Sequence, residues 1–299
     1  MSYDCIIIGG GIAGLQCAIQ LGRYMHQVLV IDAADGRSAI CRSYHNILGY
    51  PDGVSGQYLR ETGRQQAERL GVHFLQEKAE TAREIDGVFH IAASDGKTYT
   101  AKRIVLATGV MDRIPPFPNL YPCLGISVYV CPDCDGYEVK GKKAIVIGSG
   151  RTGSGMAKTL SYWTDELVYI NHEQEPLKES DMEKLESLNV EYWNVPIKEV
   201  LASGSQLEGF LLENGEKVEG TRAFIAFGSN EVKSELASQL GVELLENQHI
   251  LTDPRTKMTN VHGVWAAGDI AVHSEQVTIA MGEGCQAAIW IHKDILKSQ

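Results

Sequence analysis

The chain opens with a change in the period of its hydrophobic residues. The apolar run Cys5–Ile8 predicts a buried strand, and after a glycine-rich turn the apolar residues recur at helical spacing over roughly 13–24. A second apolar run at 27–31 predicts another strand, which ends on Asp32. Strand, helix and strand in this order predict a βαβ unit with two parallel strands.

The turn in this unit reads GGGIAG and contains the G-x-G-x-x-G spacing of dinucleotide-binding units. Gly9 permits the tight turn, Gly11 lets the backbone approach a pyrophosphate, and Gly14 allows the helix to pack closely. The pyrophosphate would lie at the positive end of the helix, and Asp32 would bind a ribose hydroxyl. The residues expected to bind the dinucleotide here are Gly9, Gly11, Ile12, Ala13, Gly14 and Asp32.

The same pattern recurs in the middle of the chain. The apolar run at 143–147 leads into GSGRTG, a helical stretch to about 162, and an apolar strand at 166–170. This repeat predicts a second nucleotide site, with the candidate residues Gly148, Gly150, Arg151 and Gly153. The same glycines can also serve only to pack the helix on the strand, without any nucleotide.

The other segments complete the predicted architecture. We expect an irregular loop at 36–56, a helix at 55–70 and a small antiparallel layer within 72–99. A strand is expected at 103–107, a hairpin at 213–215 and a final helix at 276–296. The proline-dense stretch at 113–118 predicts a domain boundary. The predicted fold class is α/β, with two Rossmann-like dinucleotide-binding domains, the second inserted in the first. The first domain would comprise 1–113 and 229–299, and the central one 114–228.

Composition narrows the classes of function. A net charge of −11 argues against a nucleic-acid partner, because such binding needs a basic surface. No apolar run reaches the length of a membrane span, and the N-terminus lacks the features of a secretory signal. Seven cysteines form a poor disulfide framework, so we expect a reducing, cytoplasmic location.

The chemistry is expected at the sequence Cys131-Pro132-Asp133-Cys134-Asp135. Cysteines three residues apart can close a small reducible disulfide, and this spacing stabilises one thiolate. Zinc would need two further ligands at structural spacing, and no second Cys-x-x-Cys or His pair is present. We therefore expect a redox-active dithiol and no metal.

Three other cysteines and His45 can be interpreted from their positions in the sequence. Cys5, Cys17 and Cys285 lie in apolar contexts and are expected in the core. His45 lies in the irregular loop and could act as a base or hydrogen-bond within the loop.

Taken together, these motifs resemble the low-molecular-weight thioredoxin reductase family of FAD-dependent pyridine-nucleotide-disulfide oxidoreductases. The resemblance covers essentially the whole chain, and its landmarks are residues 9–14, 107–109, 131–136, 148–150 and 267–269. It implies an FAD domain built from both ends of the chain and a central domain that carries the cysteine pair. It also implies a homodimer whose central domain swings between two positions, and a thioredoxin-like protein or a small disulfide or dithiol as partner.

The resemblance also assigns roles to individual residues. Cys134 would exchange electrons with the flavin C4a position, and Cys131 would attack the disulfide of the partner. Asp135 would move a proton to or from the dithiol. The other residues that it implies for FAD binding are His45, Asn46, Thr108, Gly109, Gly268, Asp269, Gln276 and Val277.

One segment departs from the family pattern. Where the family has a His-Arg-Arg run that binds the 2′-phosphate of NADPH, this chain reads Asn171-His172-Glu173-Gln174-Glu175. The two glutamates would repel a phosphate, so NADPH is disfavoured as electron donor. NADH, ferredoxin and other donors stay open. Two further alternatives also stay open: a dithiol oxidase that uses oxygen as acceptor, and a flavin-bound redox sensor.

Overall fold

The computed structural model describes residues 2–272 and 274–298, and the chain folds into two compact units. The first unit comprises Met1–Ala39, Gly56–Met111 and Glu231–Gln299, and the second comprises Ile40–Ser55 and Asp112–Asn230. The α/β class with two Rossmann-like units, the second inserted in the first, is confirmed. The boundaries at 111/112 and 230/231 lie two residues from the expected 113/114 and 228/229, and one further segment differs. Residues 40–55, predicted as part of the first domain, contact the second unit instead.

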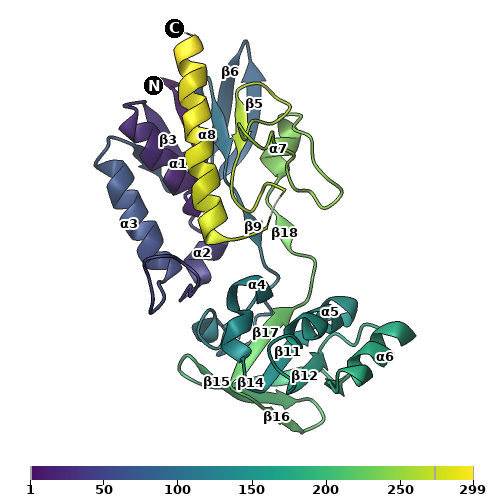
Figure 1. Ribbon diagram of the computed structural model, residues 1–299. Helices are drawn as coiled ribbons and strands as arrows, with labels where there is room; N and C mark the ends of the chain where they lie inside the picture. The colour runs from purple at the N-terminus through teal and green to yellow at the C-terminus, as the bar shows by residue number, and fades with distance from the viewer. Residues whose placement is uncertain (1, 273, 299) are drawn as a thin grey trace. The chain divides into compact units, whose positions relative to one another are not determined.

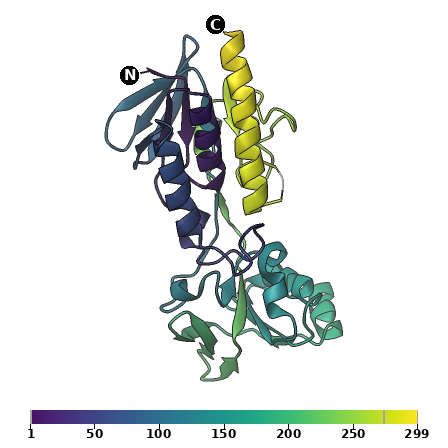
Figure 2. The same cartoon turned by 60° about the vertical axis from the view of Figure 1, so that its left-hand side comes forward.

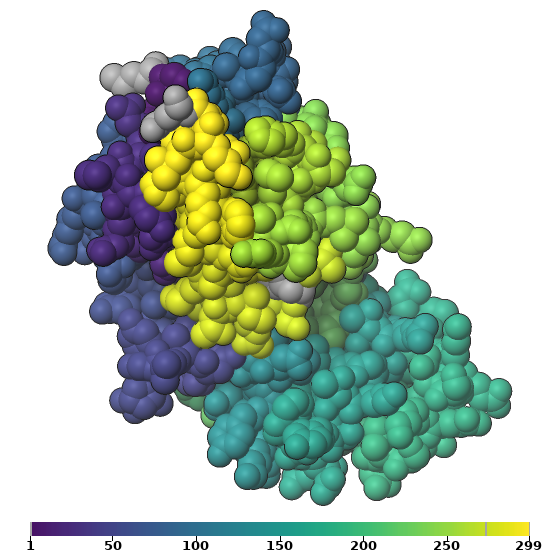
Figure 3. All heavy atoms as spheres, turned by 45° about the horizontal axis from the view of Figure 1, so that its top comes forward, coloured from purple at the N-terminus to yellow at the C-terminus, as the bar shows by residue number. Residues whose placement is uncertain are grey.

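A parallel five-stranded sheet with the order β19-β8-β2-β3-β4 forms the centre of the first unit (Figure 1). The bounds of its strands are β2 Cys5–Ile8, β3 Val28–Ile31, β4 His73–Leu75, β8 Ile104–Leu106 and β19 Val264–Ala266. The helices α1 (Ile12–Arg23) and α8 (Val277–Lys297) lie side by side against one face of this sheet, as both ribbon views show (Figure 2). In the space-filling view, α8 forms part of the surface of this unit, beside the segment that follows α7 (Figure 3).

The other face of this sheet carries a second layer. The four strands of this layer have the order β1-β7-β6-β5, and the strand β5 was not predicted from the sequence. Residues that alternate along β2 explain the two-sided core: Ile7 packs towards the helices, whereas Ile6 and Ile8 pack towards this layer. The remaining elements of the first unit are β1 Ser2–Tyr3, α2 Arg37–Ile40, α3 Gly56–Glu68, β5 Ala79–Ile85, β6 Val88–Ala93, β7 Thr98–Ala101, β9 Val110–Met111, β18 Glu231–Val232 and α7 Glu235–Gln239.

The second unit repeats the parallel arrangement in the order β10-β17-β11-β12-β13. Its strands are β10 Val128–Tyr129, β11 Ala144–Gly148, β12 Leu167–Asn171, β13 Glu191–Trp193 and β17 Arg222–Ala226. An antiparallel sheet of β14 (Ile197–Ser203), β15 (Gln206–Leu212) and β16 (Lys217–Glu219) adds the predicted hairpin, which turns at 213–216. The helical elements are η1 Tyr121–Cys123, α4 Pro132–Asp135, η2 Gly136–Val139, α5 Gly150–Leu160 and α6 Glu179–Ser187.

Within residues 2–272 and 274–298, no helix is long and apolar enough to cross a membrane.

Candidate functional site

The cysteine pair begins the short helix α4. Cys131 is the residue before the helix, in extended conformation, and the backbone N–H of Cys134 donates a hydrogen bond to its Sγ at 3.2 Å. Pro132 occupies the first helical position, where a missing N–H costs nothing. Both cysteines are half-buried thiols. The local sequence thus places the Sγ of Cys131 where a backbone donor can stabilise its thiolate.

The electrostatics of this segment suit thiol chemistry. Hydrogen bonds from the Cys134 side chain and backbone lower the pKa of Cys131, against the opposing effects of burial and of Asp133 and Asp135. The pKa of Asp135 is raised to about 7, first by burial and then by the negative charge of Glu138. A stabilised thiolate at Cys131 and a carboxyl group that titrates near neutral pH at Asp135 therefore lie four positions apart in one motif.

Two further ionisable residues of the second unit lie close to Asp135. The imidazole Nδ1 of His45 is 3.9 Å from the Oδ1 of Asp135 and 3.9 Å from the Oε1 of Glu138. Its Nε2 forms a 3.1 Å hydrogen bond with Ser43. His45 therefore belongs to the acidic cluster behind the dithiol, in the unit that does not contain the first glycine loop. The sequence did not single out Glu138, whose only signal was its distance of three residues from Asp135.

The glycine after the motif fits against an aromatic ring. A Cβ on Gly136 would lie 2.6 Å from the ring of Trp163, so no larger residue can occupy this position without moving the tryptophan. Trp163 follows the C-terminus of α5. The Cys-x-x-Cys segment is thereby held against the second Rossmann-like sheet and its helix.

The first glycine loop has the geometry expected of a dinucleotide site. A Cβ on Gly14 would lie 1.9 Å from the carbonyl oxygen of Gly9, so glycine is required where α1 meets the loop. The N–H of Gly10 donates to the Oδ1 of Asp32 at 3.0 Å. The carboxylate at the end of β3 is thus fixed beside the loop, as binding of a ribose hydroxyl requires.

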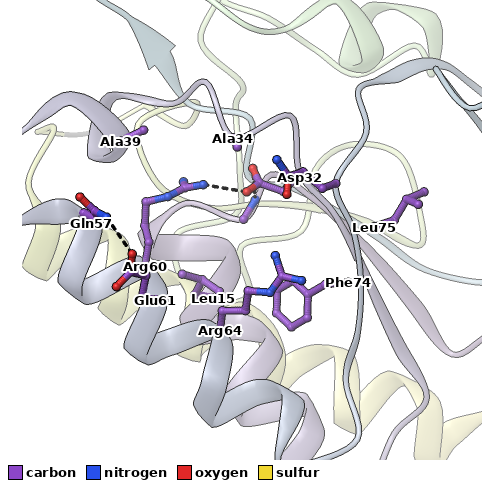
Figure 4. A pocket seen from close by; sticks show the side chains of 12 residues that line it. Leu15, Asp32, Ala34, Ala39, Gln57, Arg60, Glu61, Arg64, Phe74 and Leu75 are labelled. Atoms are coloured by element: carbon purple, nitrogen blue, oxygen red, sulfur yellow. Dashed lines mark hydrogen bonds and ion pairs between the residues drawn. The ribbon is translucent and has the colours of Figure 1, made fainter.

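A pocket of about 320 Å³ opens beside Asp32 (Figure 4). Arg60 of α3 reaches into it and pairs with the Oδ2 of Asp32 at 2.7 Å. Opposite, the guanidinium of Arg64 lies over the ring of Phe74, 5.0 Å from its centre. The pocket lies at the carboxyl ends of β3 and β4, where open α/β sheets bind ligands. Its carboxylate, cations and flat aromatic surface fit the ribose, phosphate and base of a dinucleotide.

We expect the substitution Asp32→Asn to weaken FAD binding by about 10- to 100-fold, because a charge-assisted hydrogen bond to the ribose would be lost. Titration of apoprotein with FAD, followed by quenching of flavin fluorescence, measures the affinity. Asp95→Asn is the matched control, since Asp95 lies in the β6–β7 turn of the same unit and bonds only to nearby residues. Equal FAD affinity in both variants would remove Asp32 from the binding site.

The other residues that the resemblance implied for FAD binding are distributed over both units. Thr108 donates to the carbonyl oxygen of Lys233 at 2.6 Å, which ties the end of β8 to the returning chain. Asp269 accepts a hydrogen bond from Arg37 at 2.9 Å. Arg37 was not predicted as a site residue because it lies in the irregular segment. Gly109, Gly268, Gln276 and Val277 belong to the first unit, and Asn46 belongs to the second.

The glycines of the second loop are explained by contacts within the protein. A Cβ on Gly153 would lie 2.2 Å from the ring of Tyr169, and a Cβ on Gly148 would lie 2.2 Å from the carbonyl oxygen of Ala226. Gly150 has a φ of +45° and lies against Glu175. Arg151 is exposed at the start of α5. The loop therefore has the predicted shape, but packing alone accounts for its glycines.

Comparisons with known proteins agree with this arrangement. The profile of the family described as pyridine nucleotide-disulphide oxidoreductase matches residues 3–284. A thioredoxin reductase of Treponema pallidum is 30% identical over 298 residues, which cover 96% of this chain and 95% of that protein. A thioredoxin reductase of Aquifex aeolicus is 28% identical over 302 residues, covering 97% and 93%. The crystal structure of an oxidoreductase from Agrobacterium tumefaciens is similar with a TM-score of 0.81 and 29% identity over 100% of both chains.

Proposed function

The chain belongs to the pyridine nucleotide-disulphide oxidoreductase family, and we propose that it passes electrons from FAD through Cys131 and Cys134 to a protein disulfide such as that of thioredoxin. The observation that carries this proposal is the pairing of a stabilised Cys131 thiolate with a carboxyl group of pKa about 7 at Asp135. The homodimer and the cytoplasmic location stay predictions.

The residues of the first unit support FAD as the cofactor. The loop at Gly14, the carboxylate of Asp32 and the adjoining pocket fit a dinucleotide. When bound, FAD supplies the two-electron reducing capacity that restores the dithiol. Arg37 and Asp269 form a second polar group at the C-terminal end of the first unit's sheet, and they would orient the same molecule.

The dithiol performs the exchange with the partner in two steps. The Cys131 thiolate attacks one sulfur of the partner's disulfide, so that a mixed disulfide forms and the second sulfur of the partner leaves as a thiolate. Cys134 then attacks the sulfur of Cys131 and releases the partner's first sulfur. The two electrons of the dithiol have passed to the partner, and a disulfide joins Cys131 and Cys134.

Asp135 handles the protons of this exchange. In its protonated form it donates to a leaving thiolate, and in its deprotonated form it accepts the proton of the Cys134 thiol. A pKa of about 7 keeps both forms populated at neutral pH. The imidazole of His45 lies 3.9 Å from the carboxylates of both Asp135 and Glu138.

A single-turnover experiment tests the proposal without the natural electron donor. The flavin is reduced by light under anaerobic conditions and mixed with oxidised thioredoxin in a stopped-flow instrument. We expect the absorbance of oxidised flavin to return as one disulfide is reduced per flavin. Flavin that stays reduced, together with bleaching of oxidised flavin by a small dithiol and peroxide formation in air, would instead identify a dithiol oxidase.

A further inference from the structure

The segment that follows β12 lies against the second glycine loop. The Nδ1 of His172 accepts a 2.8 Å hydrogen bond from the N–H of Ile197, and the side chain of Gln174 donates to the carbonyl oxygen of Asn194 at 3.1 Å. Glu173 lies between these two anchors, so its position is fixed by the fold of the second unit. Family members that take NADPH would use this segment to hold the nucleotide.

The carboxylate of Glu173 forms a bidentate pair with Arg113. Both of its oxygens accept hydrogen bonds from the guanidinium of Arg113, one of them at 3.2 Å from Nη1. Burial raises the pKa of Glu173, but the bonds to Arg113 and to Ser149 outweigh this effect and lower it. Ser149 is the residue that precedes α5, and it contributes no capping bond to that helix.

This location is the one that a pyrophosphate takes in a Rossmann-like unit. The pyrophosphate of a dinucleotide binds at the N-terminus of the helix that follows the glycine loop. Here the backbone N–H of His172, the residue before Glu173, donates to the carbonyl oxygen of Gly148 in the glycine loop at 2.9 Å, and an arginine that could bind a phosphate is engaged by the carboxylate of Glu173.

Asn171 stands at the position that would bind the ribose, and it also forms its hydrogen bonds within the protein. Asn171 is fully buried, and its Oδ1 accepts hydrogen bonds from the N–H of Gly150 at 2.9 Å and from the hydroxyl of Tyr169 at 3.2 Å. Its Nδ2 donates to Glu175, Tyr192 and Asn194 at 2.8–3.1 Å. An amide with all of these bonds inside the protein has none left for the two hydroxyls of a ribose.

We propose that Glu173 fills the nucleotide site of the second unit with a carboxylate of the chain itself, and that this unit binds neither NADH nor NADPH. The second unit then serves as the carrier of the dithiol, and the reductant reaches the flavin without a pyridine nucleotide at this loop. This proposal concerns binding and holds whichever way electrons flow between flavin and dithiol.

The proposal is tested by calorimetric titration of the flavin-loaded protein with NADH, NADPH and inorganic pyrophosphate. We expect no binding of either nucleotide to the wild-type protein at concentrations up to about 1 mM, since a bidentate arginine–carboxylate pair must be displaced. Glu173→Gln keeps the shape of the side chain and removes its charge. We expect this variant to bind pyrophosphate and NADH at least tenfold more tightly than the wild-type protein does.

Two control variants show whether a gain in affinity comes from removal of the carboxylate charge or from loosening of the loop. Arg113→Ala breaks the same ion pair but leaves the negative charge, so it should gain no affinity. Glu183→Ala removes an exposed acid of α6 and should change nothing. Thermal unfolding of each variant shows that the second unit is folded. Micromolar binding of a nucleotide to the wild-type protein, or no gain in Glu173→Gln, would overturn the proposal.

Discussion

Replacing Cys134 by serine should lower the rate of protein-disulfide reduction by more than about 10³-fold, because the second exchange step has no attacking sulfur. The first step is still possible, so Cys131 of this variant should accumulate as a mixed disulfide with thioredoxin. Cys131→Ser should be equally inactive but should form no mixed disulfide. Non-reducing gels and mass spectrometry of the trapped species distinguish the two outcomes.

Cys285→Ser is the control for this pair. Cys285 is a half-buried thiol on α8 in the first unit, and its replacement should leave both the rate and the flavin content unchanged. A Cys134→Ser protein that reduced thioredoxin at the wild-type rate would refute the assigned mechanism. Mixed disulfides at Cys134 in place of Cys131 would exchange the two roles.

The substitution Asp135→Asn should lower the rate of the exchange step by about 10²- to 10⁴-fold near neutral pH, the range usual for a general acid. In the wild-type protein, protonated Asp135 prevails below pH 7, so proton donation to the leaving thiolate should slow as the pH rises through about 7. The variant should lack this step in its profile. Single-turnover rates of flavin reoxidation between pH 5.5 and 8.5 measure the difference.

The stability of the protein provides a second measurement on the same group. The pKa of Asp135 is about 7 in the folded protein and its ordinary value is 3.8, so the folded state binds the proton more tightly between these values. The contribution of this group to stability should therefore fall as the pH rises from about 4 to 7 and then level off. Asp135→Asn should remove this fall, whereas Asp133→Asn, which alters an exposed acid, should keep it. Identical pH profiles in wild type and Asp135→Asn would exclude a proton role for Asp135.

The local parts of the fold could be predicted because their causes lie within a few residues. The apolar run before Gly9, the helical spacing after it and the acid at the end of the next strand specify one βαβ unit without any distant contact. The ends of the predicted helices differ from the observed ones by one or two residues, as in α3, because fraying and capping determine where a helix ends. The strand β5 was missed because only its positions Ala79 and Ala82 are buried, so its hydrophobic pattern is weak.

The parts that could not be predicted depend on partners far away in sequence. The partners of Asn171 could not be predicted, because Tyr192 belongs to β13 and Asn194 follows it, and no sequence pattern links this segment to Asn171. The pairing of Arg113 with Glu173 spans the whole of the second βαβ unit. The approach of His45 to Asp135 likewise depends on the long loop at 40–55, which has no periodic pattern from which a contact could be inferred.

The division of the chain has a consequence for biosynthesis. The residues 112–230 leave the ribosome as one continuous stretch, and they can form their parallel sheet while translation continues. The first unit, by contrast, lacks its edge strand β19 and its covering helix α8 until the last part of the chain has emerged. Until then α1 can pack against the sheet and α3, but not against α8, with which it shares its core cluster. The unit whose synthesis begins first is thus finished last.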